Sequence, residues 1–264
     1  MQSLRHYLLA LQFFTRVPVT GRLARWVGFS PQMLRASAAH FPGIGWLVGG
    51  MGAAVFVLAQ AGLPGTVGAL VAALLSTVAT VLLTGAFHED GLADVADGLG
   101  GSADRERALA IMKDSRIGAF GAIALVLALG LKVALLVVLA GQGLEVVACA
   151  IVGAHVLSRL APLFLIRWLP YVGDSGASKA KPLADAIGTG ALVTGVLWSI
   201  PAAVPVLLAQ GPARVLAMVL ACALAAAFMA RLFRRRLQGF TGDGLGATQQ
   251  VCELAIYLAL AWQA

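Results

Sequence analysis

Long apolar runs separated by short polar segments dominate the chain. Six of them reach the ~20 residues that an α-helix needs to cross the hydrocarbon core of a bilayer. These runs cover residues 43–62, 66–87, 118–140, 144–165, 190–209 and 213–230. A seventh apolar segment, 250–263, is shorter, and we expect it to lie at the interface or to pack tilted against the other helices. Because spanning helices satisfy their backbone polar groups internally, the pattern predicts an all-α, polytopic membrane bundle of six to seven helices.

A different pattern precedes the first run. Over residues 4–17 the apolar residues share one helical face and the polar residues fall opposite: Leu4, Leu8, Leu11 and Phe14 against Arg5, Gln12 and Arg16. A helix of this kind lies flat on a membrane surface, with its apolar face buried at the lipid boundary. We therefore expect an N-terminal interfacial helix that ends before Pro18.

The composition leaves no room for a soluble domain. The chain is 60% hydrophobic and 12% charged, whereas ordinary soluble domains carry roughly a quarter charged residues. We expect a single integral-membrane domain over residues 1–264. The three cysteines, Cys149, Cys222 and Cys252, are far apart and have no metal-ligand spacing, so they are expected to be small buried hydrophobes.

Basic residues predict the orientation in the membrane. Of the 19 Lys and Arg residues, 16 fall in segments 1–42, 88–117, 166–189 and 231–249, which all lie on one side if six spans alternate. The positive-inside rule places that side, with the N-terminus, in the cytoplasm of a cell whose inner membrane holds the protein. The net charge of +7 then reflects topology and attraction to the lipid bilayer. Nucleic-acid binding is not expected, since no basic patch is interleaved with aromatic residues.

An acid cluster directly follows the second apolar run. Asp90, Asp94 and Asp97 are spaced i, i+4 and i+7, which places them on one face of a helix, and Glu89 lies on its flank. Three like charges on one face repel one another, and a bound cation would relieve that repulsion. Oxygen-rich sites favour Mg²⁺ or Mn²⁺, so these four acids are candidate metal ligands. The alternative is a solvated loop with a chance cluster, and the glycines from Gly91 to Gly101 predict that the helix soon opens into a loop.

Basic residues on the same side predict a phosphate site. Lys113 and Arg116 precede the third span, and a metal with cations beside it is the usual apparatus for a diphosphate. Arg159, near the inner end of the fourth span, is a further candidate contact for an anionic substrate, because ionisable groups within spans usually face the bundle interior. Lys132, alone on the third span, is expected to extend outward to the interface. An interface anchor is the alternative for the Lys113–Arg116 pair.

Asp243 lies in a glycine-rich segment before the last apolar run. Alternating glycines let a backbone approach a phosphate or let a carboxylate reach a metal. A plain turn is the alternative. The acceptor hydroxyl of a transfer reaction also needs positioning and a base, for which Asp114, Asp243 and His88 are the candidates.

Together these segments resemble the cobalamin synthase family, the adenosylcobinamide-GDP ribazoletransferases. The matching segments are Phe13-Phe14-Thr15-Arg16-Val17-Pro18, Phe41-Pro42-Gly43-Ile44-Gly45, Phe87-His88-Glu89-Asp90-Gly91-Leu92-Ala93-Asp94 through Asp97-Gly98, Met112-Lys113-Asp114-Ser115-Arg116-Ile117-Gly118, and Gly239-Phe240-Thr241-Gly242-Asp243 through Gly246-Ala247. Their order and spacing cover nearly the whole chain, and Arg16 joins the candidate phosphate contacts through the first of them.

The resemblance implies a Mg²⁺-dependent transfer. A phosphocobinamide group would pass from adenosylcobinamide-GDP to the 5′ hydroxyl of α-ribazole, or of its phosphate, with GMP as the leaving group. Adenosylcobalamin or its 5′-phosphate would form. The number of metal ions, the choice of acceptor and the oligomeric state stay open.

Two other functions compete with this one. A CDP-alcohol lipid head-group transferase would use a signature that opens Asp-x-x-Asp-Gly, as Asp94, Asp97 and Gly98 do. The Ala-Arg pair that follows in those enzymes is absent, because Gly101 and Ser102 stand there. A cation transporter with an acidic vestibule is the alternative from another class, and the near absence of acids within the six predicted spans argues against it.

Overall fold

The computed structural model describes residues 1–173 and 187–263, and over this part of the chain it is helical with no strand. In chain order the α-helices are α1 (Gln2–Phe14), α2 (Gly21–Val27), α3 (Pro31–Ser37), α4 (Phe41–Gly62), α5 (Gly65–Thr84), α6 (Phe87–Gly101), α7 (Arg105–Met112), α8 (Ala119–Gln142), α9 (Leu144–Ser158), α10 (Ala161–Trp168), α12 (Thr189–Ser199), α13 (Ala203–Gln210), α14 (Pro212–Arg236) and α15 (Gly242–Ala261). Two short 3₁₀ turns, η1 (Ala38–His40) and η2 (Ile200–Ala202), join neighbouring helices.

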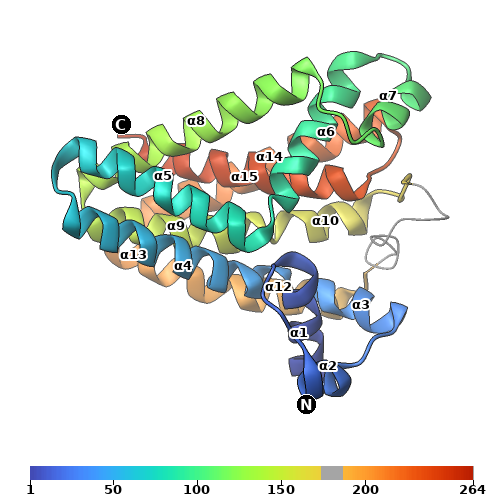
Figure 1. Ribbon diagram of the computed structural model, residues 1–264, viewed down its shortest axis with the longest axis horizontal. Helices are drawn as coiled ribbons and strands as arrows, with labels where there is room; N and C mark the ends of the chain where they lie inside the picture. The colour runs from blue at the N-terminus through green and yellow to red at the C-terminus, as the bar shows by residue number, and fades with distance from the viewer. Residues whose placement is uncertain (174–186, 264) are drawn as a thin grey trace.

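All six predicted spans are confirmed as helical segments long and apolar enough to cross a membrane. They run side by side along the long axis of the molecule (Figure 1). The chain is therefore a multi-pass membrane protein. One end of this bundle carries α6, α7 and the start of α15, and we call it the acid end. The other, the far end, carries tight connections such as those at Gly143 and Gly211, and α15 ends there (Figure 1).

Prolines interrupt two spans that the hydropathy pattern predicts as continuous. Pro162 lies in the first turn of α10 and separates it from α9, while Pro201 lies in the 3₁₀ turn between α12 and α13. Proline lacks the N–H of a helical hydrogen bond and its ring clashes with the preceding turn, so each helix breaks there. The first break leaves Arg159 at the end of α9, inside the bundle.

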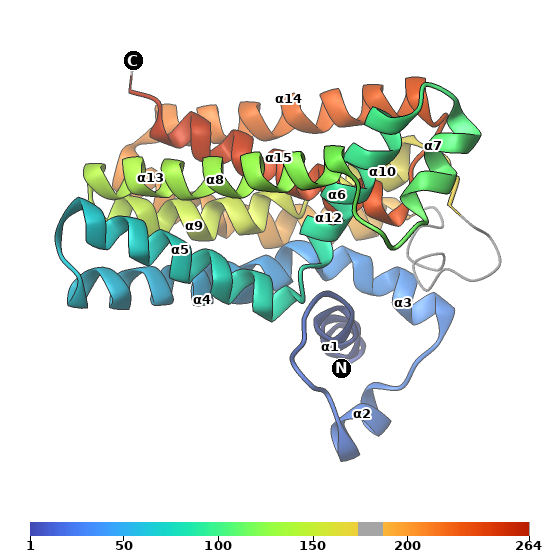
Figure 2. The ribbon, with the colours of Figure 1, turned by 45° about the horizontal axis from the view of Figure 1, so that its top comes forward.

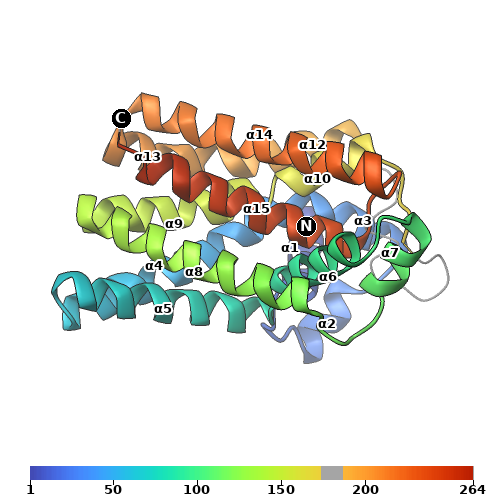
Figure 3. The same ribbon diagram turned by 90° about the horizontal axis from the view of Figure 1, so that it is seen from above.

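The seventh segment packs against the other helices, which is one of the two arrangements expected for it, but its bounds differ from the prediction. The helix over this region, α15, begins at Gly242 rather than near residue 250, and at 20 residues it is as long as a span. It packs against α14, α6, α9 and α8, and Figure 3 shows it running between α14 and α8. Its N-terminal half was missed because glycines and polar residues dilute the apolar signal there. It is a central helix of the bundle and not an interfacial one.

The predicted amphipathic helix is present as α1, which stops at Phe14 instead of residue 17. Figure 2 shows it nearly end-on, so it crosses the direction of the spans. Its face with Leu9, Leu11 and Phe14 is buried, because it packs against α3 and α4. The helix therefore docks on the bundle at the level of the acid end.

Small residues allow α4 and α9 to pack closely. A Cβ atom on Gly45 would overlap the carbonyl oxygen of His155, and one on Gly49 would lie 3.0 Å from the Cα of Val152. Gly50, on the same helix, has nothing within 4 Å of such an atom. Close approach through small residues is a common basis of helix association in membranes.

We predict that Gly45→Ala lowers the free energy of unfolding by about 1–3 kcal/mol, because the added methyl group meets backbone that cannot rotate away. Gly50→Ala is the matched control: it gains the helix propensity of alanine with no clash. Thermal unfolding of both variants in detergent checks this. Equal melting temperatures for the two would contradict the packing argument.

Candidate active site

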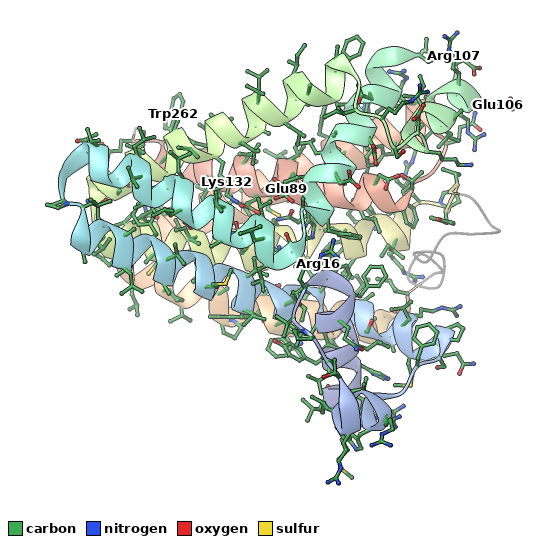
Figure 4. The ribbon with its side chains drawn as sticks, in the orientation of Figure 1. Arg16, Glu89, Glu106, Arg107, Lys132 and Trp262 are labelled. Carbon is green, nitrogen blue, oxygen red and sulfur yellow. The ribbon has the colours of Figure 1, made fainter. Side chains whose placement is uncertain are left out.

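A left-handed turn sets the direction of the acid helix α6. Gly85 (φ +68°) and Ala86 (φ +59°) both adopt the left-handed conformation between α5 and α6. The backbone N–H of Arg16 donates to the carbonyl oxygen of Leu83 at 2.7 Å. The Arg16 side chain covers Gly85 so closely that any Cβ there would overlap it (Figure 4). The residues after α1 therefore brace the turn from which α6 starts.

The helix α6 runs on to Gly101 and does not open early, contrary to the expectation from its glycines. Those glycines are contact points instead. A Cβ on Gly91 would lie 2.7 Å from the carbonyl oxygen of Asp243, and one on Gly98 would lie 2.8 Å from that of Ala108. The first contact presses α6 against the start of α15, and the second presses it against α7.

This crossing gathers carboxylates from two elements. Asp90 is exposed, Asp94 and Asp243 are half-buried, and all three lie around the contact at Gly91. Burial, followed by repulsion from Asp243, Asp90 and Asp97, raises the pKa of Asp94 to about 7. A carboxyl group that resists ionisation because acids surround it is relieved by a cation.

Asp97 bonds to the start of α8 and not to the other acids. Its two carboxylate oxygens accept hydrogen bonds from the backbone N–H groups of Gly118 at 2.7 Å and Gly121 at 2.8 Å. These groups belong to the start of α8, where a helix leaves its first N–H groups without partners. Asp97 therefore caps α8 and ties it to α6.

Glu89 and His88 lie on the inner face of α6. Glu89 Oε1 accepts a hydrogen bond from Gln250 at 3.0 Å, and both side chains are buried. The His88 ring stacks on Phe41, with a centroid distance of 5.8 Å and an interplanar angle of 14°. Burial lowers the pKa of His88, because it disfavours the charged imidazolium. Among the four predicted metal ligands, Glu89 is thus the one turned into the bundle.

Aromatic rings connect α1 to this inner face. Phe14 stacks on Phe41 at a centroid distance of 4.0 Å, and Phe13 meets Phe87 edge-on at 5.7 Å. With His88 they line a cavity of about 30 Å³, room for about one water molecule.

The predicted phosphate contacts divide into an exposed and a buried group. Arg116 is exposed and pairs with Asp114, the closest approach being 2.5 Å between Arg116 Nη2 and Asp114 Oδ2. Hydrogen bonds from Arg116 lower the pKa of Asp114 to about 2, which makes this carboxylate a weak base. Lys113 is exposed at the end of α7. Arg159, in contrast, is 1% exposed and donates to the carbonyl oxygen of His155 at 2.8 Å.

The structure overturns one expectation outright. Lys132 does not extend to the interface: it is 3% exposed and its Nζ lies 2.7 Å from Oε1 of Glu253, on α15. The signal that could have revealed this pair is one basic and one acidic residue, each alone in an apolar segment, because such residues usually face the bundle interior and pair. Lys179 and Lys181, counted among the basic residues of the 166–189 segment, lie outside the described residues.

No group of three or more His, Cys, Asp or Glu side chains among residues 1–173 and 187–263 converges closely enough to hold a metal ion as it stands. The donor chemistry fits a hard divalent cation, since Asp90, Asp94 and Asp243 offer only carboxylate oxygens. The raised pKa of Asp94 points the same way. Side-chain rotation at exposed Asp90 and half-buried Asp94 would be needed to bring the oxygens together.

Comparison with known proteins decides the family. A sequence profile of the cobalamin-5-phosphate synthases matches residues 6–261. The chain belongs to this family. It is 60% identical over 275 residues to the adenosylcobinamide-GDP ribazoletransferase of Albidiferax ferrireducens, with 98% of each chain covered. It is 59% identical to that of Polaromonas naphthalenivorans, with 99% of each covered, and 44% identical to that of Shewanella amazonensis, with 98% of this chain and 95% of the relative covered.

Membership makes the chain an enzyme, a transferase of cobalamin biosynthesis. It confirms the resemblance carried by the sequence motifs. The lipid head-group transferase and the cation transporter are thereby set aside, although the spans do contain a buried ionic network. No solved structure matches the chain.

The raised pKa of Asp94 makes the stability of the folded protein depend on pH. Its folded-state pKa of about 7 lies above the ordinary value of 3.8, so between these values the folded protein binds more protons than the unfolded chain. Stability therefore falls as the pH rises from about 4 to about 7, and Asp94→Asn removes this contribution. We predict that, as the pH rises from about 4 to about 7, the melting temperature of Asp94→Asn increases relative to that of the unmutated protein.

Thermal unfolding in detergent with a chelator present, between pH 4.5 and 8, measures this difference. Glu106→Gln is the control, because it removes one carboxylate at the outer end of α7 (Figure 4). A difference for Asp94→Asn that does not change with pH would contradict the crowding of acids at this site.

Proposed function

We propose that this chain joins adenosylcobinamide-GDP and α-ribazole, or its 5′-phosphate, in a Mg²⁺-dependent reaction at the acid end of the bundle. The products are adenosylcobalamin, or its 5′-phosphate, and GMP. The observation that supports this most directly is the meeting of Asp90 and Asp94 with Asp243 where α6 crosses α15. The relatives are named for adenosylcobinamide-GDP, a substrate that carries a diphosphate. Carboxylates bind a diphosphate through a metal ion that lies between them.

In this proposal the residues divide between holding the donor and activating the acceptor. Asp90 and Asp94 would hold Mg²⁺, which would supply positive charge to neutralise the diphosphate oxygens. Asp243, beside them, would stay free to accept a proton. Asp97 contributes by keeping α8 capped against α6. Arg116 and Lys113, on the segment that leads to α8, contact the phosphates, and Arg16 beside the α5–α6 turn is a third basic contact.

The transfer itself is an in-line displacement. A free ribose hydroxyl of the ribazole attacks the phosphorus that carries the cobinamide, a new P–O bond forms, and the P–O bond to GMP breaks. This hydroxyl is not the expected 5′ hydroxyl, because the 5′ oxygen of the 5′-phosphate acceptor is already esterified. The hydroxyl proton passes to a base. We propose Asp243 for this role, because Asp114 is held as a weak base by Arg116 and His88 is sealed beneath Phe41. Asp243 is half-exposed at the site.

Loss of one electrostatic contact in a transition state typically costs on the order of 10²–10³ in rate. We therefore predict that Asp94→Asn and Asp243→Asn lower kcat at least that far in detergent while the variants stay folded. GMP release should need both α-ribazole and Mg²⁺ or Mn²⁺, and a chelator should stop it. Glu106→Gln is the charge-matched control.

Two results would remove the proposal. Full turnover in chelator would exclude the metal, and GMP release without α-ribazole would indicate a hydrolase. Asp114→Asn separates the candidate bases: if it stops turnover while Asp243→Asn does not, the base is Asp114.

We further propose that the acid end faces the cytoplasm and that the protein resides in the inner membrane. The support is the distribution of Lys and Arg, since among the described residues only Arg214 lies near the far end. Ser102 lies just after α6 at the acid end, and Gly141 lies at the far end of α8.

We predict that a single cysteine at Ser102, in a chain without the three native cysteines, reacts with a membrane-impermeant thiol reagent only after the cells are opened. A cysteine at Gly141 should react in intact cells whose outer membrane is permeable. The reverse pattern would show the opposite orientation.

A further inference from the structure

An ion pair lies deep between the spans. Lys132 is near the middle of α8 and Glu253 is on α15, and the two side chains are 4% and 1% exposed. Their closest atoms are 2.7 Å apart. Burying a charge costs several kcal/mol even when it is paired, and apolar residues in both places would often be as stable or more so. Ionisable residues at this depth are therefore expected to serve the function.

Hydrogen bonds continue from this pair toward the acid helix. Gln249 donates to Glu253 Oε2 at 2.7 Å and to the hydroxyl of Ser158 at 2.9 Å. Gln250 donates to Gln249 Oε1 at 3.1 Å and to Glu89 Oε1 at 3.0 Å. An unbroken series of polar contacts thus leads from Glu253 along α15 to the first turn of α6. Figure 4 shows Lys132 and Glu89 close together within the bundle.

Polar side chains of α9 lie beside this series of contacts. His155 Nδ1 lies 3.4 Å from Glu253 Oε2 and 3.0 Å from Arg159 Nη1. Because a guanidinium only donates, this ring nitrogen accepts from Arg159 and has no proton to donate to Glu253. Arg159 also bonds the carbonyl oxygen of His155, which the break at Pro162 leaves without a helical partner. Glu253 thus bonds Lys132 of α8 and Gln249 of α15, and the Gln249 amide in turn reaches Ser158 at the end of α9.

We propose that this network, which we call the Glu253 network, positions the acid helix for the reaction proposed above. Glu253 and Gln249 orient the Gln250 amide, and Gln250 holds Glu89 on the inner face of α6. In a helix of 3.6 residues per turn, anchoring Glu89 inward leaves Asp90 and Asp94, one and five residues later, on the face that meets Asp243. Glu89, Gln250 and Glu253 are positioning residues and touch no substrate.

Other contacts hold the rest of α6. Asp97 ties its last turns to α8, and Arg236 donates to the carbonyl oxygens of Leu99 at 3.1 Å and Ser102 at 2.6 Å. Among the described residues, the hydrogen bond from Gln250 to Glu89 is the side-chain hydrogen bond that holds the first turn of α6. The inference therefore concerns the half of α6 that carries Asp90 and Asp94.

Two double variants separate hydrogen bonding from charge. Lys132→Met/Glu253→Gln removes both charges but keeps an acceptor for Gln249, whereas Lys132→Met/Glu253→Leu removes the acceptor as well. Gln250→Leu cuts only the last link. All are purified in detergent, and kcat and KM for GMP release are measured together with backbone hydrogen exchange across α6.

We expect Gln250→Leu and Lys132→Met/Glu253→Leu to lower kcat on the order of 10²-fold, since misplacement of a reacting group by about 1 Å has that effect. KM should change little, and α6 should exchange faster. Lys132→Met/Glu253→Gln should stay close to the unmutated protein in all three. If Lys132→Met/Glu253→Leu fails to fold, Gln250→Leu decides alone.

The inference is overturned if Gln250→Leu has the same kcat and the same hydrogen exchange in α6 as the unmutated protein. So would an equal loss in the two double variants, which would assign the effect to charge. Failure of the proposed function looks different: the unmutated protein would then release no GMP with Mg²⁺ and α-ribazole, while the exchange of α6 would still report whether Gln250 positions the helix.

Discussion

A charge inside a bundle of apolar helices must find a partner, because neither water nor lipid can solvate it there. Lys132 meets this constraint through Glu253, and much of the architecture depends on that pairing. It requires α15 to run inside the bundle against α8, although its own apolar signal is weak. Once α15 is inside, its first turn is carried to the acid end, where Asp243 meets α6. The helix α15 thus connects the buried pair, which it reaches through Glu253, with the carboxylates that meet Asp243 at its first turn.

The site also depends on how closely backbones approach. Gly91 lets α6 touch the backbone of Asp243, and Gly98 lets it touch α7. Arginines hold the same region from outside: Arg236 bonds the last carbonyls of α6, and Arg105 bonds the carbonyl of Leu237 after α14 at 2.7 Å. These arginines were counted only as topology signals in the sequence. In the structure each also satisfies the end of a neighbouring helix, as cations near a helix C-terminus do.

Local patterns were enough for the spans, because an apolar run of about 20 residues has few alternatives, and the i, i+4, i+7 spacing of Asp90, Asp94 and Asp97 did predict their shared helix. The errors arose where the deciding contact was distant in sequence. Lys132 was expected to reach the interface because the sequence of α8 gives no sign of its partner Glu253, which lies on α15. The glycines of α6 were interpreted as loop signals because their contacts with Asp243 and Ala108 are tertiary. Likewise, nothing near Glu89 shows that Gln250 draws it inward, away from the other acids.

The order of the helices along the chain has a consequence for biosynthesis. The helix α8 enters the membrane well before α15 is made, since synthesis proceeds from the N-terminus. Until then Lys132 lacks the carboxylate that pairs with it in the finished protein, and the buried Arg159 has no acid of α15 nearby. A chain that stops before α15 would keep unpaired basic groups within the bilayer, a mark by which membrane quality control can recognise an unfinished product. Completion of the last helix would therefore stabilise the fold and assemble the site in a single event.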